Sequence, residues 1–419
     1  MSATTTRTAT ALGAARRVDF PTLSRTVHGR RLVYLDSGAS SQTPQVVMDT
    51  MDDYYSRFRS NVHRGVYQLA EEATDLFERG RSRMATFIDT PVEGLVFTKN
   101  STEAMNLVAW SWVRTRLGPD DALLTTRMEH HANFVPYLHA QQDRGFDLRT
   151  IPLTPDGRLD HDVARELLAD GKVTFLALVH VSNVLGTIND VAALAEMARD
   201  ANPDCRVLVD GSQAVPQMPV SVRDLGVDFY AATGHKMCGP TGVGMLAARP
   251  ELLEEMPPFL TGGEMILDVT LDGFTTNEVP HKFEAGTPMI AEVGGLGTAV
   301  DYLTDLGMDR VRAHEHELVG ELIDALLSVE GVTVHGPMDP DLRGGAVSFE
   351  LAGVHPHDVG AMLDQHGVAI RVGHHCAKPL MRELGVNATA RASLGLYNDR
   401  DDLGPLVEGL ERARTFFAR

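Results

Sequence analysis

The sequence predicts an α/β protein with a mainly parallel central sheet flanked by helices, followed by a smaller α+β domain. Between about residues 95 and 248, apolar runs of strand length alternate with amphipathic runs of helix length. That alternation is typical of parallel strands joined by helical crossovers. A Gly-rich stretch then separates this region from a second set of elements, and 419 residues suffice for two domains.

The expected sheet is built from short apolar runs separated by helical stretches. The run from Val173 to Val179 is almost continuously apolar, which predicts a central strand covered on both faces. Ligands of such sheets bind at the carboxyl ends of the strands. The expected strands are Leu95–Thr98, Ala122–Thr125, Leu148–Leu153, Val173–His180, Arg206–Asp210, Val227–Ala232 and Val243–Ala247, with helices such as Thr102–Arg116 and Val191–Arg199.

The second domain follows the Gly-rich stretch Gly286–Gly297, which predicts a junction. Met308–Val329 carries an apolar stripe and should form a long amphipathic helix. We expect residues 18–35 to be an N-terminal segment packing on this domain, residues 36–300 to be the large domain, and residues 301–419 to be the small one. Its other expected elements are the strands Ala346–Leu351 and Val368–Val372 and the terminal helix Asp399–Ala418.

Residues 1–17 are rich in Thr, Ala and Arg and contain no acidic residue, which predicts a disordered tail. A transit peptide has a similar composition, but a secretory apolar core is missing. The net charge of −19 argues against nucleic-acid or anionic membrane partners, and no run approaches the ~18 apolar residues of a membrane span. Three scattered cysteines do not form a disulfide framework, so we expect a reducing, cytoplasmic location.

Two strand ends carry the strongest chemical signal. The run Arg206–Asp210 ends on a carboxylate, and the next strand opens into a glycine-bearing turn that ends at Lys236. Pyridoxal phosphate needs a carboxylate to keep its pyridine nitrogen protonated and a lysine to form a Schiff base. The ordinary alternative is a strand-end aspartate and a solvated lysine.

A phosphate site is expected where Ser101 and Thr102 open a helix directly after a strand. Exposed amides and two hydroxyls at a helix N-terminus suit an anion. A plain N-cap with Glu103 is the alternative, and the two are compatible. At neighbouring strand ends, His130 could stack on a flat heterocycle, and Asn183 is placed to hydrogen-bond a ring substituent.

In the second domain, the residues of the segment Arg371–Pro379 are the ones that most suggest chemical reactivity. Cys376 follows two histidines and precedes Lys378, an electropositive setting that favours the nucleophilic thiolate. A buried structural cysteine is one alternative. A zinc site from His374 to Cys376 is another, although the spacing of a structural zinc motif is missing, and we expect no metal. Beyond this loop, the fork of Arg391 suits an amino-acid carboxylate, or else a surface ion pair.

These blocks together resemble the class V aminotransferase group of fold-type I pyridoxal-phosphate enzymes, and within it the SUF-type cysteine desulfurases. The resemblance runs from about Leu32 to Phe417. It rests on the ordered blocks Tyr34–Ser40, Asn61–Gly65, Glu129–Asn133, His180–Thr187, Asp210–Gln213, Gly234–Lys236, Phe283–Pro288 and Arg371–Cys376.

The resemblance implies a role for each matching residue. Lys236 would form the Schiff base, Asp210 would pair with the pyridinium nitrogen, and His130 would stack on the ring. Thr287 would reach the phosphate of a neighbouring subunit, which implies a homodimer. The other implied contacts are Gln213 with the ring hydroxyl, Ser101, Thr102, Thr233 and His235 with the phosphate, and His63, Asn183, Arg371 and Arg391 with the substrate.

The implied reaction converts L-cysteine to L-alanine. Lys236 would act as the base, and Cys376 would take the sulfur as a persulfide. A SufU- or SufE-like acceptor would then receive it for iron–sulfur cluster assembly, with tRNA thiolation or a natural product as other destinations. The alternative enzyme is a selenocysteine lyase, and the alternative of another class is a catalytically silent scaffold that delivers sulfur proteins to their partners.

Overall fold

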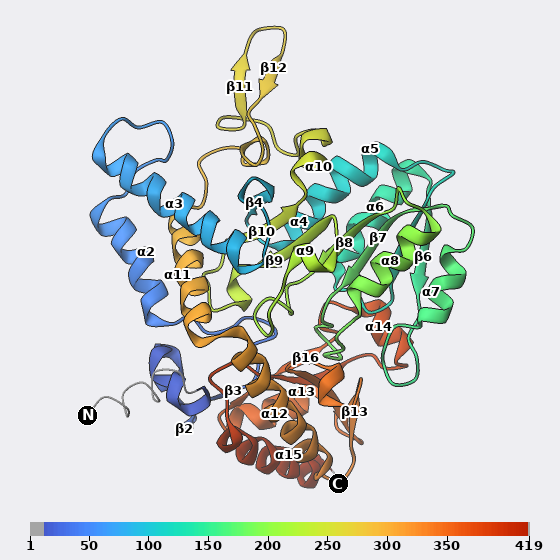
Figure 1. The fold of residues 1–419 in the computed structure, drawn as a ribbon. Coiled ribbons are helices and arrows are strands. Elements are labelled where there is room, and N and C mark those ends of the chain that lie inside the picture. The colour runs from blue at the N-terminus through green and yellow to red at the C-terminus, as the bar shows by residue number, and fades with distance from the viewer. Residues whose placement is uncertain (1–11, 418–419) are drawn as a thin grey trace.

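A seven-stranded sheet forms the centre of the molecule in the computed structural model, which describes residues 12–417 (Figure 1). Its strand order is β4-β10-β9-β8-β7-β5-β6, and β10 alone runs antiparallel to its neighbours. The seven predicted strands are confirmed, with bounds shifted by two residues at most. They are β4 (Leu95–Thr98), β5 (Ala122–Thr126), β6 (Asp147–Ile151), β7 (Val173–Val179), β8 (Arg206–Asp210), β9 (Phe229–Thr233) and β10 (Gly244–Ala248).

Helices cover both faces of this sheet, which explains the continuously apolar β7. Leu176 and Leu178 face one core together with α3, α7, α8 and α11, whereas Phe175 and Ala177 face the other with α4, α6 and α10. The predicted helix over Thr102–Arg116 contains a π-helical turn between α4 and α5. The helices are α2 (Gln45–Arg57), α3 (Gln68–Phe87), α4 (Ser101–Val108), α5 (Arg114–Arg116), α6 (Val135–Arg144), α7 (His161–Leu168), α8 (Val191–Ala201), α9 (Val222–Leu225), α10 (Pro250–Glu255) and α11 (Ile290–Leu306).

The C-terminal part contains a four-stranded antiparallel sheet of order β13-β14-β17-β16 and its own apolar core. The predicted long helix is confirmed as α12 (Met308–Leu327). The remaining elements are β13 (Val332–His335), β14 (Ala346–Leu351), α13 (Pro356–Gln365), β15 (Val368–Ala369), β16 (Arg371–Gly373), α14 (Lys378–Glu383), β17 (Thr389–Ser393) and α15 (Leu403–Phe417). The domain boundaries at residues 36 and 301 stay a prediction.

The N-terminal segment contributes a strand to this C-terminal part. After a small ribbon of β1 (Thr26–Val27) and β2 (Arg30–Arg31), β3 (Val33–Tyr34) pairs in parallel with β15. The next residue, Leu35, bridges two partners, because its amide donates to Ala369 and its carbonyl accepts from Ser393. Residues from both ends of the chain therefore build one unit.

Three predictions about elements are wrong. Gly13–Asp19 form a 3-10 helix whose first amide donates to Leu396, so the disordered tail does not extend to residue 17; its residues 1–11 lie outside the described ones. The Gly-rich stretch is no junction, since most of it lies inside α11. A Cβ on Gly294 would lie 2.7 Å from the Leu76 side chain, so the glycine permits close packing against α3. The predicted strand Val368–Val372 is two strands, because β15 pairs with β3 whereas β16 pairs with β17.

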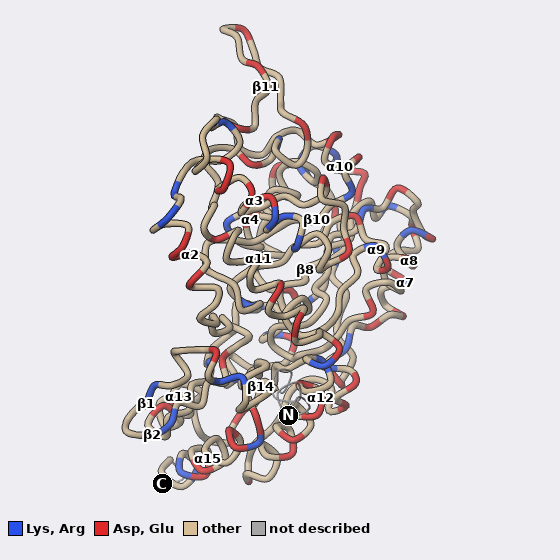
Figure 2. The backbone as a smooth tube through the Cα atoms, turned by 60° about the vertical axis from the view of Figure 1, so that its left-hand side comes forward, with Lys and Arg blue, Asp and Glu red and all other residues tan. Residues whose placement is uncertain are grey.

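A β-hairpin of β11 (Ile266–Val269) and β12 (Phe274–Thr276) projects from the large sheet region (Figures 1 and 2). Leu267, Val269, Leu271 and Phe274 are exposed on it. Acidic and basic residues are interspersed over the rest of the chain (Figure 2). Within residues 12–417, no helix is long and apolar enough to cross a membrane.

Candidate active site

Asp210 and Lys236 meet at the carboxyl edge of the large sheet because β8 and β9 are parallel neighbours. Asp210 ends β8 with 4% of its surface exposed and accepts a hydrogen bond from the Ser212 amide at 3.0 Å. Lys236 ends the short 3-10 turn that follows β9. Burial lowers the pKa of Lys236 to about 8, against the opposing effect of the Asp210 charge. The amine is therefore uncharged far more often near neutral pH than an exposed lysine would be.

His130 lies close enough to Asp210 and Lys236 for both charges to affect the pKa of its ring. Burial, assisted by the Lys236 charge, lowers the pKa of His130 to about 4. Its Nδ1 accepts a hydrogen bond from the Ala132 amide at 3.1 Å, so the neutral ring carries its proton on Nε2. A neutral, partly buried imidazole suits stacking on a flat heterocycle.

The predicted phosphate residues converge where β4 and β9 end and the antiparallel β10 begins. Gly244 of β10 pairs with Thr98 on one side and Thr233 on the other. A Cβ on Gly244 would lie 2.5 Å from the Asn100 backbone, so only glycine permits this approach. Asn100 caps α4 by accepting the Glu103 amide at 3.0 Å, which confirms the N-cap. Within the part of the chain that the structure describes, the Ser101 and Thr102 hydroxyls have no hydrogen-bond partner.

In the part of the chain that the structure describes, several polar atoms at this edge are buried without a partner, which is uncommon unless a ligand satisfies them. They include Thr233 Oγ1, Ser212 Oγ and Asn183 Oδ1. Together with the Asp210 carboxylate and the Lys236 amine, these donors and acceptors fit the hydroxyls, ring nitrogen and phosphate of pyridoxal phosphate.

Two further predicted cofactor residues face the segment that follows β3. Gln213 donates to the Gly38 carbonyl at 2.7 Å. The His235 ring lies 3.3 Å from the Ser40 hydroxyl, and burial lowers the pKa of His235 to about 4. Both therefore lie beside the predicted site, with the neutral His235 able to donate from one ring nitrogen.

Cys376 is brought to the same edge from the C-terminal part. The charges of Asp210, Arg391, Arg371 and Cys376 all affect the pKa of Lys236. The Cys376 amide donates to His374 Nδ1 at 3.1 Å, and the preceding His375 carbonyl accepts from Asn183 Nδ2 at 2.7 Å. The thiol is partly exposed, whereas Cys205 and Cys238 are buried. The structural-cysteine alternative therefore fits the other two cysteines better than Cys376.

Arg391 is buried and fixed by hydrogen bonds, as expected of a side chain that binds a substrate carboxylate. It is 1% exposed, so the surface ion pair is the wrong interpretation. Nη1 donates to the Asn183 carbonyl at 2.7 Å, Nη2 lies 3.0 Å from Asp36 Oδ1, and Nε has no partner in the described part of the chain. Arg371 lies directly opposite on β16, which adds a second cationic group.

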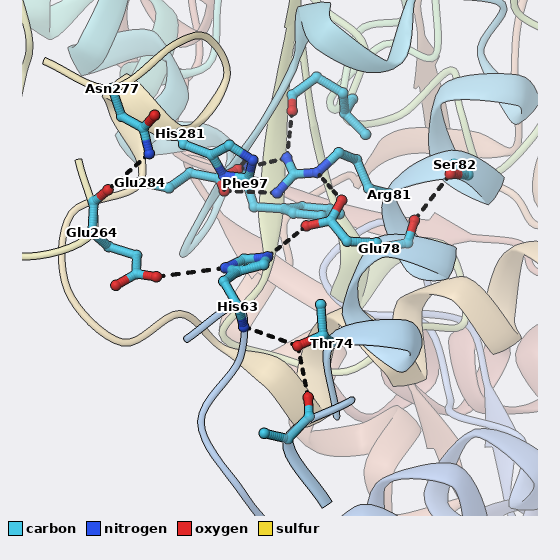
Figure 3. Close-up of polar contacts among 12 residues, drawn as sticks. His63, Thr74, Glu78, Arg81, Ser82, Phe97, Glu264, Asn277, His281 and Glu284 are labelled. Carbon is cyan, nitrogen blue, oxygen red and sulfur yellow. Dashed lines mark hydrogen bonds and ion pairs between the residues drawn. The ribbon is translucent and has the colours of Figure 1, made fainter. Parts of the chain in front are cut away.

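His63 and Thr287 lie apart from this group. His63 contacts Glu78 at 2.9 Å and Glu264 at 3.6 Å, and its amide donates to Thr74 (Figure 3). None of the contacts that the described residues make with His63 involves the Lys236 group. Thr287 is exposed before α11 and borders a pocket that Thr98 and Glu103, beside the predicted phosphate residues, also line. Among residues 12–417, no contact joins His63 or Thr287 to Lys236, although Thr287 lies near the start of α4.

A buried charge cluster that was not predictable from the sequence lies beside the predicted phosphate residues (Figure 3). Arg81 of α3 makes two hydrogen bonds to Glu284, at 2.8 and 2.7 Å, and one to the Leu95 carbonyl of β4. Glu284 also accepts the Phe97 amide at 2.7 Å. Burial opposes the charge of Glu284, but Arg81 lowers its pKa to about 2. The cluster therefore fixes β4 against α3 and the Thr287 segment.

Among residues 12–417, no three His, Cys, Asp or Glu side chains are grouped so that they could hold a metal ion. Two of the three candidate ligands from His374 to Cys376 have other partners: His374 Nδ1 accepts the Cys376 amide, and His375 Nε2 lies 2.9 Å from Thr389 Oγ1. These two imidazoles therefore stabilise the loop.

Comparison with known proteins covers almost the whole chain. The family model for class-V aminotransferases matches residues 33–406. A cysteine desulfurase from Haloferax volcanii is 46% identical over 418 residues, covering 96% of this chain and 97% of the relative, and one assigned in Streptomyces coelicolor is 48% identical over 96% and 97%.

Solved structures agree with this assignment. The apo cysteine desulfurase of Thermococcus onnurineus superposes with a TM-score of 0.88 at 38% identity, over 94% of this chain and 97% of that one. An Escherichia coli cysteine desulfurase in its S-sulfonic acid form gives 0.88 at 37% identity, over 96% and 98%. The chain belongs to the class-V aminotransferase family, among the pyridoxal-phosphate-dependent cysteine desulfurases.

Proposed function

We propose that this chain removes sulfur from L-cysteine, releases L-alanine and holds the sulfur as a persulfide on Cys376. The placement of Asn183 carries the proposal. Its side chain binds the His375 carbonyl beside the nucleophile, and its own carbonyl accepts from Arg391. One residue thus sets the spacing between the group that would hold the substrate carboxylate and the thiol that would take its sulfur.

Each residue has a chemical role in this scheme. Pyridoxal phosphate would be held by Lys236, Asp210 and His130 and, at its phosphate, by Ser101, Thr102, Thr233 and His235. When bound, it supplies an electron sink for the substrate carbon. Lys236, whose pKa burial lowers to about 8 so that a large share of the amine is uncharged near that pH, moves the α-proton. Arg391 and Asn183 orient the substrate. Cys376 attacks the substrate sulfur, so that the Cβ–S bond breaks while the S–S bond of the persulfide forms.

We further propose a homodimer in which His63 and Thr287 complete the site of the other subunit. Both lie on one side of the molecule, linked through the 263–287 segment, since the Gly286 amide donates to the Gly263 carbonyl next to Glu264. Neither reaches Lys236 in its own chain. If His63 and Thr287 reached the site of the other subunit, they could make the substrate and phosphate contacts predicted from the sequence even though they lie apart from Lys236 in their own chain.

The sulfur acceptor is proposed to be a SufU- or SufE-like protein that serves iron–sulfur cluster assembly. A persulfide on a partly exposed cysteine must be passed on before the next turnover. The three free thiols support a reducing, cytoplasmic setting for this transfer.

The decisive experiment measures alanine and sulfide formed from L-cysteine by the purified protein and by Cys376→Ser. The wild type should form both, whereas the variant should keep the visible absorption of bound pyridoxal phosphate and lose alanine formation. Full activity of Cys376→Ser on cysteine would contradict the proposed nucleophile. A wild-type protein that binds the cofactor but forms no alanine would contradict the proposed reaction.

A further inference from the structure

His131 holds the Cys376 loop at two points, the carbonyl of the reactive cysteine and an amide two residues after it. Its backbone amide donates to the Cys376 carbonyl at 2.7 Å. Its ring Nε2 accepts the Lys378 amide at 3.0 Å, where α14 begins. His131 belongs to the 3-10 turn after β5, so a residue of the large sheet region fixes a loop that lies more than 240 positions further along the chain.

The loop needs such support because its backbone is strained. His375 and Cys376 have φ values of 49° and 55°, a left-handed conformation that non-glycine residues rarely adopt, here at two consecutive positions. Strain of this kind persists only where the surroundings determine the conformation. Asn183 and the His374 ring each bind one group of this loop, whereas His131 binds two, the Cys376 carbonyl and the Lys378 amide.

The ring can accept the Lys378 amide only while it is neutral, because an imidazolium has no free lone pair. The groups facing it favour that state. His374 lies 5.7 Å away between ring centroids, His130 lies 6.3 Å away, and Lys378 and Cys376 lie on the loop itself. Burial, with the charges of His374 and Lys378, lowers the pKa of His131.

We propose that His131 is a positioning residue whose neutral ring fixes the Cys376 thiol at the substrate sulfur, and whose protonation releases the loop. The inference rests on the proposed function of Cys376. It follows that the persulfide is presented from a fixed position, so that the acceptor must approach the loop.

Kinetics of the holoenzyme test the positioning role. His131→Ala should lower kcat for alanine formation about 10- to 100-fold, because small displacements of a reacting group are costly. KM should change little, since Arg391 remains in place, and the cofactor absorption should be retained. His131→Gln should recover much of the loss, because its carboxamide oxygen can accept the Lys378 amide. His139→Ala, which removes an exposed histidine of α6, is the matched control.

Hydrogen exchange of residues 374–378 tests the clamp independently of activity. Corrected for the intrinsic pH dependence, wild-type protection should be lost as the pH falls through the lowered pKa of His131. His131→Ala should be unprotected at every pH, and His131→Gln protected at every pH. Unchanged kcat and unchanged protection in His131→Ala would overturn the inference. A wild type without desulfurase activity but with this exchange pattern would overturn the proposed function alone.

Discussion

Arg81 and Glu284 form a two-point ion pair in the interior of the large domain, with Nη1 and Nη2 lying 2.8 and 2.7 Å from the two carboxylate oxygens. Arg81 is 1% and Glu284 9% exposed. Since Glu284 also accepts the Phe97 amide, the pair connects the strand before the phosphate turn with the segment before Thr287. Two regions distant in sequence thus depend on one buried contact.

Arg81→Met should therefore destabilise the protein by about 3–5 kcal/mol, because an unpaired carboxylate would remain buried. Urea unfolding measures this loss. Arg83→Met is the matched control on the same helix: Arg83 forms a partly exposed pair with Asp301 at 2.9 Å, and its removal should cost at most about 1 kcal/mol. Similar losses in the two variants would show that the buried pair has no special role.

Lys236→Ala should abolish the visible absorption of bound pyridoxal phosphate, because no other amine occupies the end of β9. Alanine formation should be lost with it. Spectra of the purified variant check the first outcome, and Lys172→Ala, which removes an exposed lysine, should leave the spectrum unchanged. An unaltered spectrum in Lys236→Ala would refute the cofactor assignment.

Arg391→Lys should raise KM for cysteine about 10- to 100-fold, the range expected when a charge-assisted hydrogen bond to a carboxylate is lost. The lysine keeps a positive charge beside Asp36 but cannot present the fork. Steady-state kinetics should show a smaller change in kcat than in KM. The opposite pattern would place Arg391 in the chemical step instead of in substrate binding.

The pair of His63 and Glu78 should make stability depend on pH. The hydrogen bond that the His63 ring donates to Glu78, together with the charge of Glu264, raises the pKa of His63 in the folded protein. Its stabilising contribution is therefore complete below the unfolded pKa of about 6.5 and is lost as pH rises through the folded value. The difference in Tm between wild type and His63→Gln should be larger at pH 6 than at pH 9. A difference independent of pH would contradict the charged pair.

The sequence was a good guide where function and fold place the same demand on a residue. Asp210 ends a buried strand and Lys236 ends the short turn after the next one, so both the apolar pattern and the polar end are visible in the chain. The two-sided burial of β7 was equally visible. Its residues alternate between the two cores, and both cores demand apolar side chains.

Long-range contacts were not predictable. Arg81 looks like any charged residue of an amphipathic helix, and only the folded chain shows it meeting Glu284 about 200 positions later. The Gly-rich stretch Gly286–Gly297 predicted a junction, yet its Gly294 permits close packing between α3 and α11. His131 was visible only as half of a histidine pair, because its partners on the Cys376 loop come from the far end of the chain.

The pairing of β3 with β15 has a consequence for synthesis. All strands of the sheet that leads to Lys236 have been synthesised once the chain reaches residue 248. The unit that carries Cys376 cannot form so early, because β3 pairs with β15 and the next residue, Leu35, with β17, which are synthesised near the end of the chain. Domains generally fold as units, N-terminal ones first, while the chain emerges from the ribosome. We therefore expect the sheet that ends at Lys236 to form before the unit that positions Cys376, so that a partly synthesised chain holds the predicted lysine site without the predicted nucleophile.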